Sequence, residues 1–142
     1  MARTRVETRA RARALQALYA WDMRGSGSSE LERVATQVWD DLAITPEERR
    51  IAGPIVRVVA SKARSLDEQL ADVTTNWRLE RIGAVERCVL RLAAAELTIG
   101  ETPPRVVIQE AVTLSERFGS AASAKFVNGV LDALARRMGR IP

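Results

Sequence analysis

The sequence contains no histidine at all and one cysteine among its 142 residues. Without histidine it lacks the commonest general base and the commonest zinc ligand. Cys88 alone excludes an internal disulfide and a cysteine-rich metal site, and we interpret it as a small buried core residue. Ser–His and Cys–His nucleophiles are therefore excluded. Carboxylate chemistry stays open, but we expect a protein that is not an enzyme and that needs no cofactor and no metal.

Long apolar runs are also missing. A transmembrane helix needs about 18 or more consecutive apolar residues, and no such run is present. The first residues are rich in arginine and lead straight into helix-patterned sequence, so they lack the apolar core of a secretory signal. We expect a cytoplasmic protein with no membrane contact.

Aromatic residues make up only 4% of the chain, whereas apolar residues in total make up 46%. Alanine, leucine and arginine are frequent, and such side chains lose little rotamer freedom in a helix. No stretch shows the alternation of a strand bounded by hairpin turns. We therefore predict one all-α domain of six to seven helices.

The helical spacing of apolar residues indicates where these helices lie. It predicts helices over about 6–23, 31–42, 45–73, 84–99, 103–118 and 120–138. The helix over 84–99 is apolar nearly all round, which is typical of the centre of a bundle. Glu96 projects into its most apolar arc, so we expect this carboxylate to pair with an arginine or to cap a backbone amide. Pro54 predicts a kink near Arg50 in the long third helix, or an early break of that helix.

The positive charge is concentrated at one end of the chain. Residues 1–24 hold six arginines against two acidic residues, whereas residues 25–142 hold 16 basic and 16 acidic residues, so the whole net charge of +4 lies in the first segment. Charge runs usually form a solvated helix face. A local excess of this size also favours a surface that binds an anion such as RNA.

Several segments resemble the family of the bacterial transcription antitermination factor NusB. They are ARALQALYAWD (12–22), IGAVERCVLRLAAAEL (82–97), PPRVVIQEAVTLSERFG (103–119) and KFVNGVLDAL (125–134). The resemblance runs from Arg9 to Leu134, which is nearly the whole chain, and KFVNGVLD is its most specific part.

This resemblance implies a fold of two three-helix bundles set roughly at right angles, with the boundary near residue 76. The N-terminal bundle would span about 1–76 and the C-terminal bundle about 77–142. It implies no enzymatic activity. It implies pairing with ribosomal protein S10, also called NusE, and binding of the single-stranded boxA sequence of nascent ribosomal RNA. The pair would help the RNA polymerase antitermination complex to read through terminators, and some members form homodimers.

The resemblance also suggests site residues. Arg9 and Arg11 match the arginine-rich opening of the family, while Glu7 and Thr8 stand where flanking basic residues are usual. Glu86 matches an acid on the S10-facing side, whereas Ala121-Ala122 replaces an acidic pair and Ala95 replaces a tyrosine. Arg105 and Lys125 match further basic positions of the family, while Arg13, Arg5 and Arg3 could replace the missing charge from neighbouring positions. The expected RNA-binding residues are therefore Arg5, Arg9, Arg11, Arg13, Arg105 and Lys125. We expect the first-helix arginines to face solvent.

Other residues favour structural interpretations. We expect Trp21, Trp39 and Trp77 in the core or between bundles, and Phe118 on the inward face of its helix. Gly129 in mid-helix indicates close approach of another helix, because glycine there costs about 1 kcal/mol relative to alanine. Asn128 would either bridge two helices inside the bundle, which we prefer, or face RNA.

Two other functions compete with antitermination. The same helical domain resembles the N-terminal part of ribosomal RNA cytosine methyltransferases, where it positions a catalytic domain. This sequence shows no catalytic cysteine motif, so it would be a fragment of such an enzyme. A helix-turn-helix DNA-binding protein is the third hypothesis, but the basic cluster lies on the first helix and no recognition helix follows a tight turn.

Overall fold

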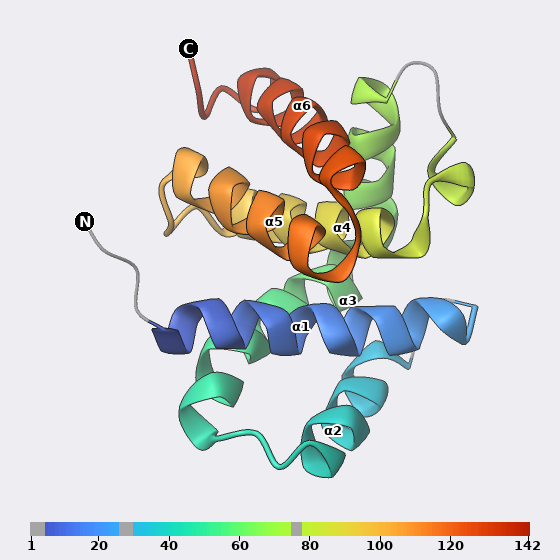
Figure 1. Ribbon diagram of the computed structural model, residues 1–142, viewed down its shortest axis with the longest axis vertical. Helices are drawn as coiled ribbons and strands as arrows, with labels where there is room; N and C mark the ends of the chain where they lie inside the picture. The colour runs from blue at the N-terminus through green and yellow to red at the C-terminus, as the bar shows by residue number, and fades with distance from the viewer. Residues whose placement is uncertain (1–4, 26–29, 75–77) are drawn as a thin grey trace.

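The computed structural model describes residues 5–25, 30–74 and 78–142. Within these residues the chain forms six α-helices, one short 3₁₀ helix and no strand (Figure 1). The all-α prediction is therefore confirmed. The elements are α1 (Arg5–Met23), α2 (Leu31–Asp41), α3 (Pro46–Val73), η1 (Leu79–Arg81), α4 (Ala84–Ile99), α5 (Pro104–Phe118) and α6 (Ala121–Arg137).

The ends of these helices are set by local sequence. Thr45 caps α3, because its hydroxyl accepts a hydrogen bond from the amide of Glu48 while the Glu48 carboxylate accepts one from the amide of Thr45. Gly100 ends α4 in the left-handed region at φ 79°, where glycine carries no Cβ penalty. Ser120 caps α6 by accepting a hydrogen bond from the amide of Ser123. Because these signals lie within a few residues, the predicted boundaries agree with the observed ones.

The helices form two groups joined by the long α3. In Figure 1, α1 and α2 lie below α4, α5 and α6, and α3 extends from the lower group to the upper one. Every residue of α4 from Cys88 to Leu97 is buried, which confirms the prediction of a central helix. Because α3 packs on α4 as well as on α1, the buried side chains form one continuous core. A division of the chain at residue 76 stays a prediction.

The expected kink at Pro54 is wrong. Residues on both sides of Pro54 keep helical geometry, and the break in α3 lies instead at Lys62, with φ −126° and ψ 21°. Pro54 is exposed, while its neighbours Gly53 and Ile55 are buried. The freed carbonyl one turn before the proline belongs to exposed Arg50, where water can take the place of the lost amide.

A partly buried charge network joins α1, α3 and α4. Arg87 and Arg91 of α4 both donate to the Asp22 carboxylate, at 2.6 and 2.9 Å. Arg91 also pairs with Asp67 of α3 at 2.9 Å, and Arg87 donates to the carbonyl of Ile82 at 2.6 Å. Burial alone would raise the pKa of Asp22. The hydrogen bonds that it accepts from Arg87 and then from Arg91 outweigh burial, so its pKa is lowered. The network therefore fixes the segment before α4 to the end of α1.

The neighbouring thiol behaves as the sequence predicted. Cys88 is completely buried, and burial raises its pKa to about 12. A thiol with this pKa is not a nucleophile near neutral pH. Among the described residues, no helix has the length and apolar character needed to cross a membrane.

Candidate functional site

Arg9 and Arg13 form the exposed basic face of α1. The side chain of Arg9 is 52% exposed and that of Arg13 is 28% exposed. Both approach the same carboxylate on α3: the Nε atoms of Arg9 and Arg13 lie 3.2 and 3.7 Å from Oε2 of Glu48. The structure therefore brings these two predicted RNA-binding residues together and holds them side by side.

Glu48 is a rigid support for this pair because it is fixed by the α3 capping box. Its side chain is only 3% exposed. The hydrogen bond from the Thr45 amide, and then the charges of Arg9 and Arg13, lower the pKa of the Glu48 carboxyl group despite its burial. Two arginines share one negative charge, so the cluster keeps a net positive charge that faces solvent.

Arg11 does not belong to this exposed surface, and the expectation that it faces solvent is wrong. Its side chain is 6% exposed and points into the molecule between α1, α4 and α5. Its Nε and Nη2 atoms donate to the two carboxylate oxygens of Glu96 at 2.7 and 3.0 Å, and Nη1 donates to Glu110 at 3.1 Å. A guanidinium held in this way is not free to bind a phosphate.

The same contacts confirm the prediction for Glu96, which pairs with an arginine. Burial alone would lower the pKa of Arg11, but the hydrogen bond that it donates to Glu96 and the charges of Glu96 and Glu110 outweigh burial, so the pKa is raised and the guanidinium stays charged. Thr8 adds a hydrogen bond from its hydroxyl to Glu110 at 2.9 Å. Position 11 therefore joins the two helix groups through buried charges.

An aromatic groove lies beside the basic face, and the sequence analysis missed it. Tyr19 of α1 is 41% exposed and Phe118 of α5 is 36% exposed, and they line a depression of about 280 Å³ together with Leu15, Gln16 and Val85. Phe118 was predicted to point inward. That prediction is wrong, because the ring lies in the last turn of α5 with the guanidinium of Arg117 4.9 Å from its centre.

The groove is continuous with the basic face. Nη1 of Arg13 donates to the side-chain oxygen of Gln16 at 3.3 Å, and Gln16 lines the groove. A polyanion bound at Arg9 and Arg13 would therefore have exposed aromatic rings within reach on the same surface. This is the arrangement that single-stranded nucleic acid requires, since phosphates and bases need different partners.

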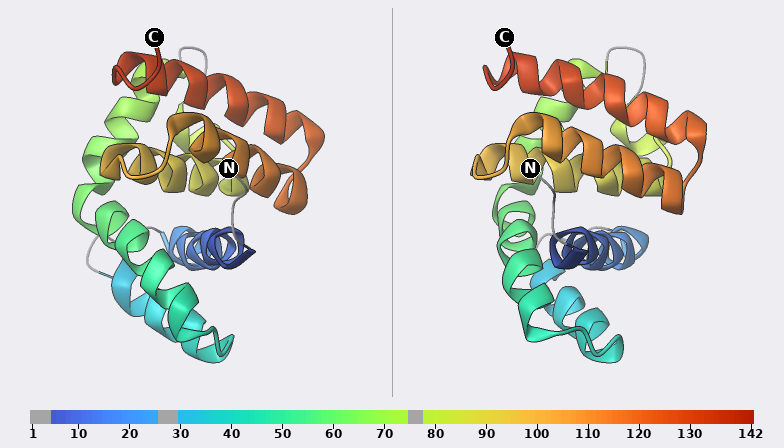
Figure 2. Two further views of the ribbon diagram at one scale, coloured as in Figure 1. Left: turned by 90° about the vertical axis from the view of Figure 1, so that its left-hand side faces the viewer. Right: turned by 60° about the vertical axis from the view of Figure 1, so that its left-hand side comes forward.

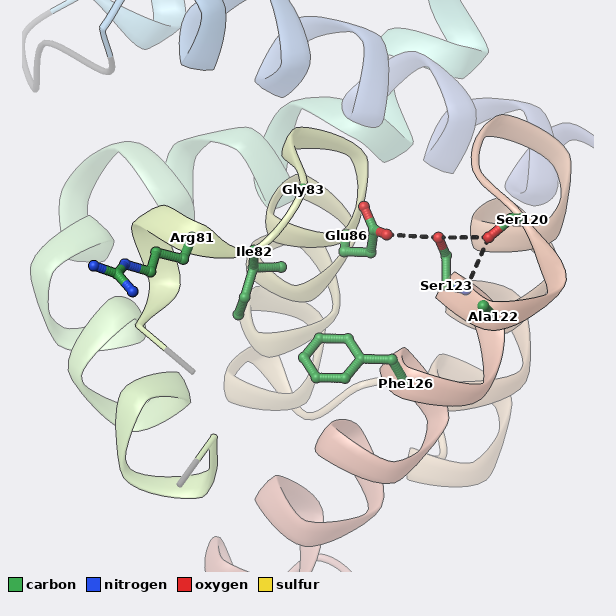
Figure 3. Close-up of a pocket in the computed structure, with 8 residues that line it drawn as sticks. All are labelled: Arg81, Ile82, Gly83, Glu86, Ser120, Ala122, Ser123 and Phe126. Carbon is green, nitrogen blue, oxygen red and sulfur yellow. Dashed lines mark hydrogen bonds between the residues drawn. The ribbon is translucent and has the colours of Figure 1, made fainter. Parts of the chain in front are cut away.

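Glu86 lies in a second depression, of about 350 Å³, between the start of α4 and the start of α6 (Figure 3). The hydroxyl of Ser123 donates to Oε2 of Glu86 at 2.5 Å, and Ser123 is itself held by the capping residue Ser120. Ile82 and Phe126 supply apolar walls, as Figure 3 shows. The depression therefore combines one carboxylate, that of Glu86, with the cation of Arg81 and with apolar walls, which fits a protein partner that brings charged residues within an apolar contact.

Gly83 leaves the room that the Glu86 carboxylate occupies. A Cβ atom at position 83 would lie 2.5 Å from Oε1 of Glu86. Any side chain at this position would push the carboxylate away. Lys125 is exposed in the first turns of α6, next to Phe126, and it makes no ion pair with any residue that the structure describes.

Arg105 lies apart from both depressions. It is exposed and lines a shallow depression between α5 and α6 with Gln109, Asn128 and Asp132. Our preference for Asn128 inside the bundle is wrong, because its side chain is exposed. The close helix expected at Gly129 is absent as well, since a Cβ atom there would meet nothing within 4 Å.

The remaining predicted residues have mixed outcomes. Trp21 and Trp39 are buried as expected, and the indole of Trp39 donates to the carbonyl of Arg13 at 2.9 Å. Arg5 begins α1. Trp77 and Arg3 lie outside the residues that the structure describes.

Comparisons with known proteins agree on one family. The model of the NusB family matches residues 8–136. The transcription antitermination protein NusB of Anaeromyxobacter dehalogenans strain 2CP-1 is 45% identical over 131 residues, covering 90% of this chain and 89% of that protein. The NusB protein of Sorangium cellulosum strain So ce56 is 43% identical over 129 residues, covering 90% of each chain.

Solved structures give the same result. T. maritima NusB is 28% identical with a TM-score of 0.80, covering 96% of this chain and 93% of that one. A crystal structure of the antitermination factors NusB and NusE in complex with double-stranded RNA gives 28% identity and a TM-score of 0.84, covering 95% of this chain and 99% of the other.

Proposed function

Because the chain belongs to the NusB family, we propose that it is an antitermination factor that binds boxA RNA of ribosomal transcripts together with ribosomal protein S10. The observation that carries the RNA part is the Arg9–Arg13 pair, of which Arg9 is exposed and Arg13 partly exposed, beside the groove of Tyr19 and Phe118. The similar solved complex contains NusB, NusE and RNA, which supports the same partners here.

The proposed RNA site has two parts with different tasks. Arg9 and Arg13 contact phosphates, and release of counterions supplies most of the affinity. Tyr19 and Phe118 stack on unpaired bases, which single-stranded RNA exposes. Arg105 and Lys125 stay in the proposal as exposed cations on the C-terminal helices, whereas Arg11 leaves it as a buried structural residue.

The proposed S10 surface is the depression around Glu86. It adjoins the aromatic groove, because Val85 lines the groove and Glu86 is the next residue. Bound RNA and bound S10 would therefore contact each other near the start of α4. Each partner would then bind partly to the protein and partly to the other partner. This arrangement explains how a chain with few base-reading groups gains sequence selectivity from a partner.

The protein acts in this proposal by binding and not by catalysis, within the cytoplasmic RNA polymerase antitermination complex. The relatives are named as antitermination proteins. These names do not favour the alternative of an RNA-positioning domain in a ribosomal RNA methyltransferase. Self-association of the free protein would compete with S10 if it covered the same apolar walls.

The test of the function is fluorescence anisotropy of a labelled boxA RNA, titrated with the protein with and without S10 of the same organism. A scrambled RNA of equal length is the control. Sequence-selective binding that strengthens with S10 supports the proposal. Weak binding that ignores both the RNA sequence and S10 would overturn it.

Replacement of Tyr19 by alanine is expected to weaken boxA binding about 5- to 100-fold, because a base loses its stacking partner. Tyr19→Phe keeps the ring and should bind nearly as well as wild type. Leu42→Ala is the control, since Leu42 is 43% exposed on another helix end. Equal affinities for Tyr19→Ala and Leu42→Ala would remove the groove from the RNA site.

Glu86→Gln is expected to weaken S10 binding about tenfold while leaving boxA binding without S10 unchanged, because it removes one charge from an interface. Gly83→Ala should act in the same direction, since its Cβ displaces the carboxylate. Glu116→Gln, at an exposed position of α5, is the matched control. Isothermal titration calorimetry with S10 measures all three, and unchanged affinity in Glu86→Gln would place the partner elsewhere.

A further inference from the structure

The middle of α3 carries a second concentration of positive charge. Residues 49–66 contain five basic residues and no acidic residue. The net charge of the whole helix does not show this excess, because acidic residues lie on both sides of the segment. Glu47 and Glu48 precede it, and Asp67 and Glu68 follow it. The function proposed above makes no use of it.

The structure places four of these residues in the solvent. Arg50 and Arg57 are seven residues apart in the regular part of α3 and share one face of the helix, and Arg64 is exposed beyond the break at Lys62. Lys62 is exposed at the break in α3. We call Arg50, Arg57, Lys62 and Arg64 the α3 stripe. Arg49 is excluded, because it pairs with Asp40 at 2.5 Å.

The charges of the α3 stripe are largely uncompensated. Arg57, Lys62 and Arg64 make no ion pair or hydrogen bond with any residue in the described part of the chain. Arg50 has one contact, at 3.7 Å to Glu47, and its side chain is 70% exposed. Four other exposed arginines have closer carboxylate partners: Arg9 with Glu48, Arg33 with Glu30, Arg136 with Asp132 and Arg137 with Asp72. The stripe therefore remains available to an external anion.

The α3 stripe begins near the basic face of α1 but lies on another side of α3. Arg9 and Arg13 contact Glu48 in the first turn of α3, whereas Arg50, two residues later, lies about 200° around the helix. Arg50 also lines a cavity of about 260 Å³ in which Glu7 and Arg11 of α1 take part. Three carboxylates line this cavity, those of Glu7, Glu96 and Glu101, and they lower the local potential, so the uncompensated charge lies further along α3.

The stripe has the length and position of a strand-binding track. Its span of 14 residues corresponds to about 21 Å of helix. In the left-hand view of Figure 2 the middle of α3 forms the edge of the molecule, and no other helix covers it there. Arg57 lies back along the helix, since its Nη1 atom would stand 3.2 Å from a Cβ at Gly53. Its charge is thereby directed back towards the start of α3.

We infer that the α3 stripe is a second RNA-binding surface, which holds the phosphates of transcript segments that flank the one bound at α1. The inference rests on the proposed RNA-binding function and extends it to a longer piece of RNA. The absence of exposed aromatic residues among the stripe favours backbone contacts without base recognition. It therefore predicts affinity that depends on RNA length and not on the flanking sequence.

The test compares two labelled RNAs, a short boxA segment and the same segment extended on both sides by arbitrary sequence, each titrated in the presence of S10 over a series of salt concentrations. The variant is Arg57→Gln/Lys62→Gln/Arg64→Gln. The matched control is Arg33→Gln/Arg136→Gln/Arg137→Gln, which removes the same charge from other exposed positions. Thermal unfolding checks that both variants fold.

We expect the extended RNA to bind wild type more tightly than the short one, and the α3 variant to lose about tenfold in affinity for the extended RNA only. Its log–log salt slope should become less steep by about 2, because each contact with a single strand contributes about 0.7. The control variant should keep both values near those of wild type.

The other outcomes have separate meanings. Equal affinity of wild type and the α3 variant for the extended RNA would overturn the inference and leave the stripe as a surface for an acidic protein. An equal loss in the control variant would also overturn it, because the effect would come from net charge. Failure of wild type to bind either RNA would overturn the proposed function itself.

Discussion

Replacement of Arg11 by alanine is expected to lower the free energy of unfolding by about 3–5 kcal/mol, because it leaves two buried carboxylates without their cation. Glu96 and Glu110 have side chains that are 6% and 5% exposed, and three of their hydrogen bonds come from the Arg11 guanidinium. Both acids belong to the C-terminal helices, whereas Arg11 belongs to α1. The loss therefore acts on the contact between the two helix groups.

Chemical and thermal unfolding followed by circular dichroism measures this effect. The melting temperature should fall by about 10–15 °C for a chain of this size. Arg9→Ala is the control, since its side chain is 52% exposed and its pair with Glu48 should contribute about 1 kcal/mol or less.

A second variant separates buried charge from lost packing. Arg11→Ala/Glu96→Gln/Glu110→Gln removes the two carboxylate charges together with their partner, and neutral amides are less costly to bury than unpaired carboxylates. It should recover part of the lost stability. A melting temperature for Arg11→Ala close to that of wild type would contradict the assignment of Arg11 to the interior.

The sequence predicted the helices well because their signals are local. The capping box of Thr45 and Glu48, and Gly100 after α4, act within four residues of the helix ends. The central position of α4 followed from apolar residues that lie nearly all round the helix. Such patterns need no knowledge of what the helix packs against.

The candidate site was harder to predict, because it depends on contacts between distant segments. Arg11 belongs by sequence to a row of arginines, yet its partner Glu96 lies 85 residues away. Both partners of this contact could be recognised in the sequence. Glu96 in an apolar arc requires a cation, and Arg11 lies at the edge of the apolar face of α1. Combining these two signals would have removed Arg11 from the RNA-binding set.

Phe118 and Asn128 show the limit of helical periodicity. Phe118 continues the apolar stripe of α5, but it stands in the last turn, where the neighbouring helix no longer covers the stripe. Asn128 and Gly129 lie on an uncovered side of α6. Position along a helix gives the direction of a side chain, whereas its burial depends on where the neighbouring helices end.

Arg9→Gln/Arg13→Gln is expected to weaken boxA RNA binding about tenfold or more at low salt, because it removes the two cations of α1 that lie at the proposed RNA site. The log–log salt slope should become less steep by about 1.4, as expected for two phosphate contacts on a single strand. Anisotropy titrations over a salt series measure both quantities. Arg24→Gln/Arg33→Gln removes the same charge from exposed positions outside the site and is the matched control.

Glu48, which both arginines contact, provides a test in which RNA affinity should change in the opposite direction. Glu48→Gln removes the negative charge that Arg9 and Arg13 share, while the amide oxygen of glutamine can still accept the hydrogen bond from Thr45 in the capping box. RNA affinity should therefore rise a few-fold, and α3 should keep its start. If the site is electrostatic, the two substitutions shift affinity in opposite directions without a large change in melting temperature. A loss of RNA binding in Glu48→Gln with the fold intact would contradict this expectation. It would mean that orientation of the arginines by the Glu48 carboxylate matters more for RNA binding than the positive charge gained when the carboxylate is removed.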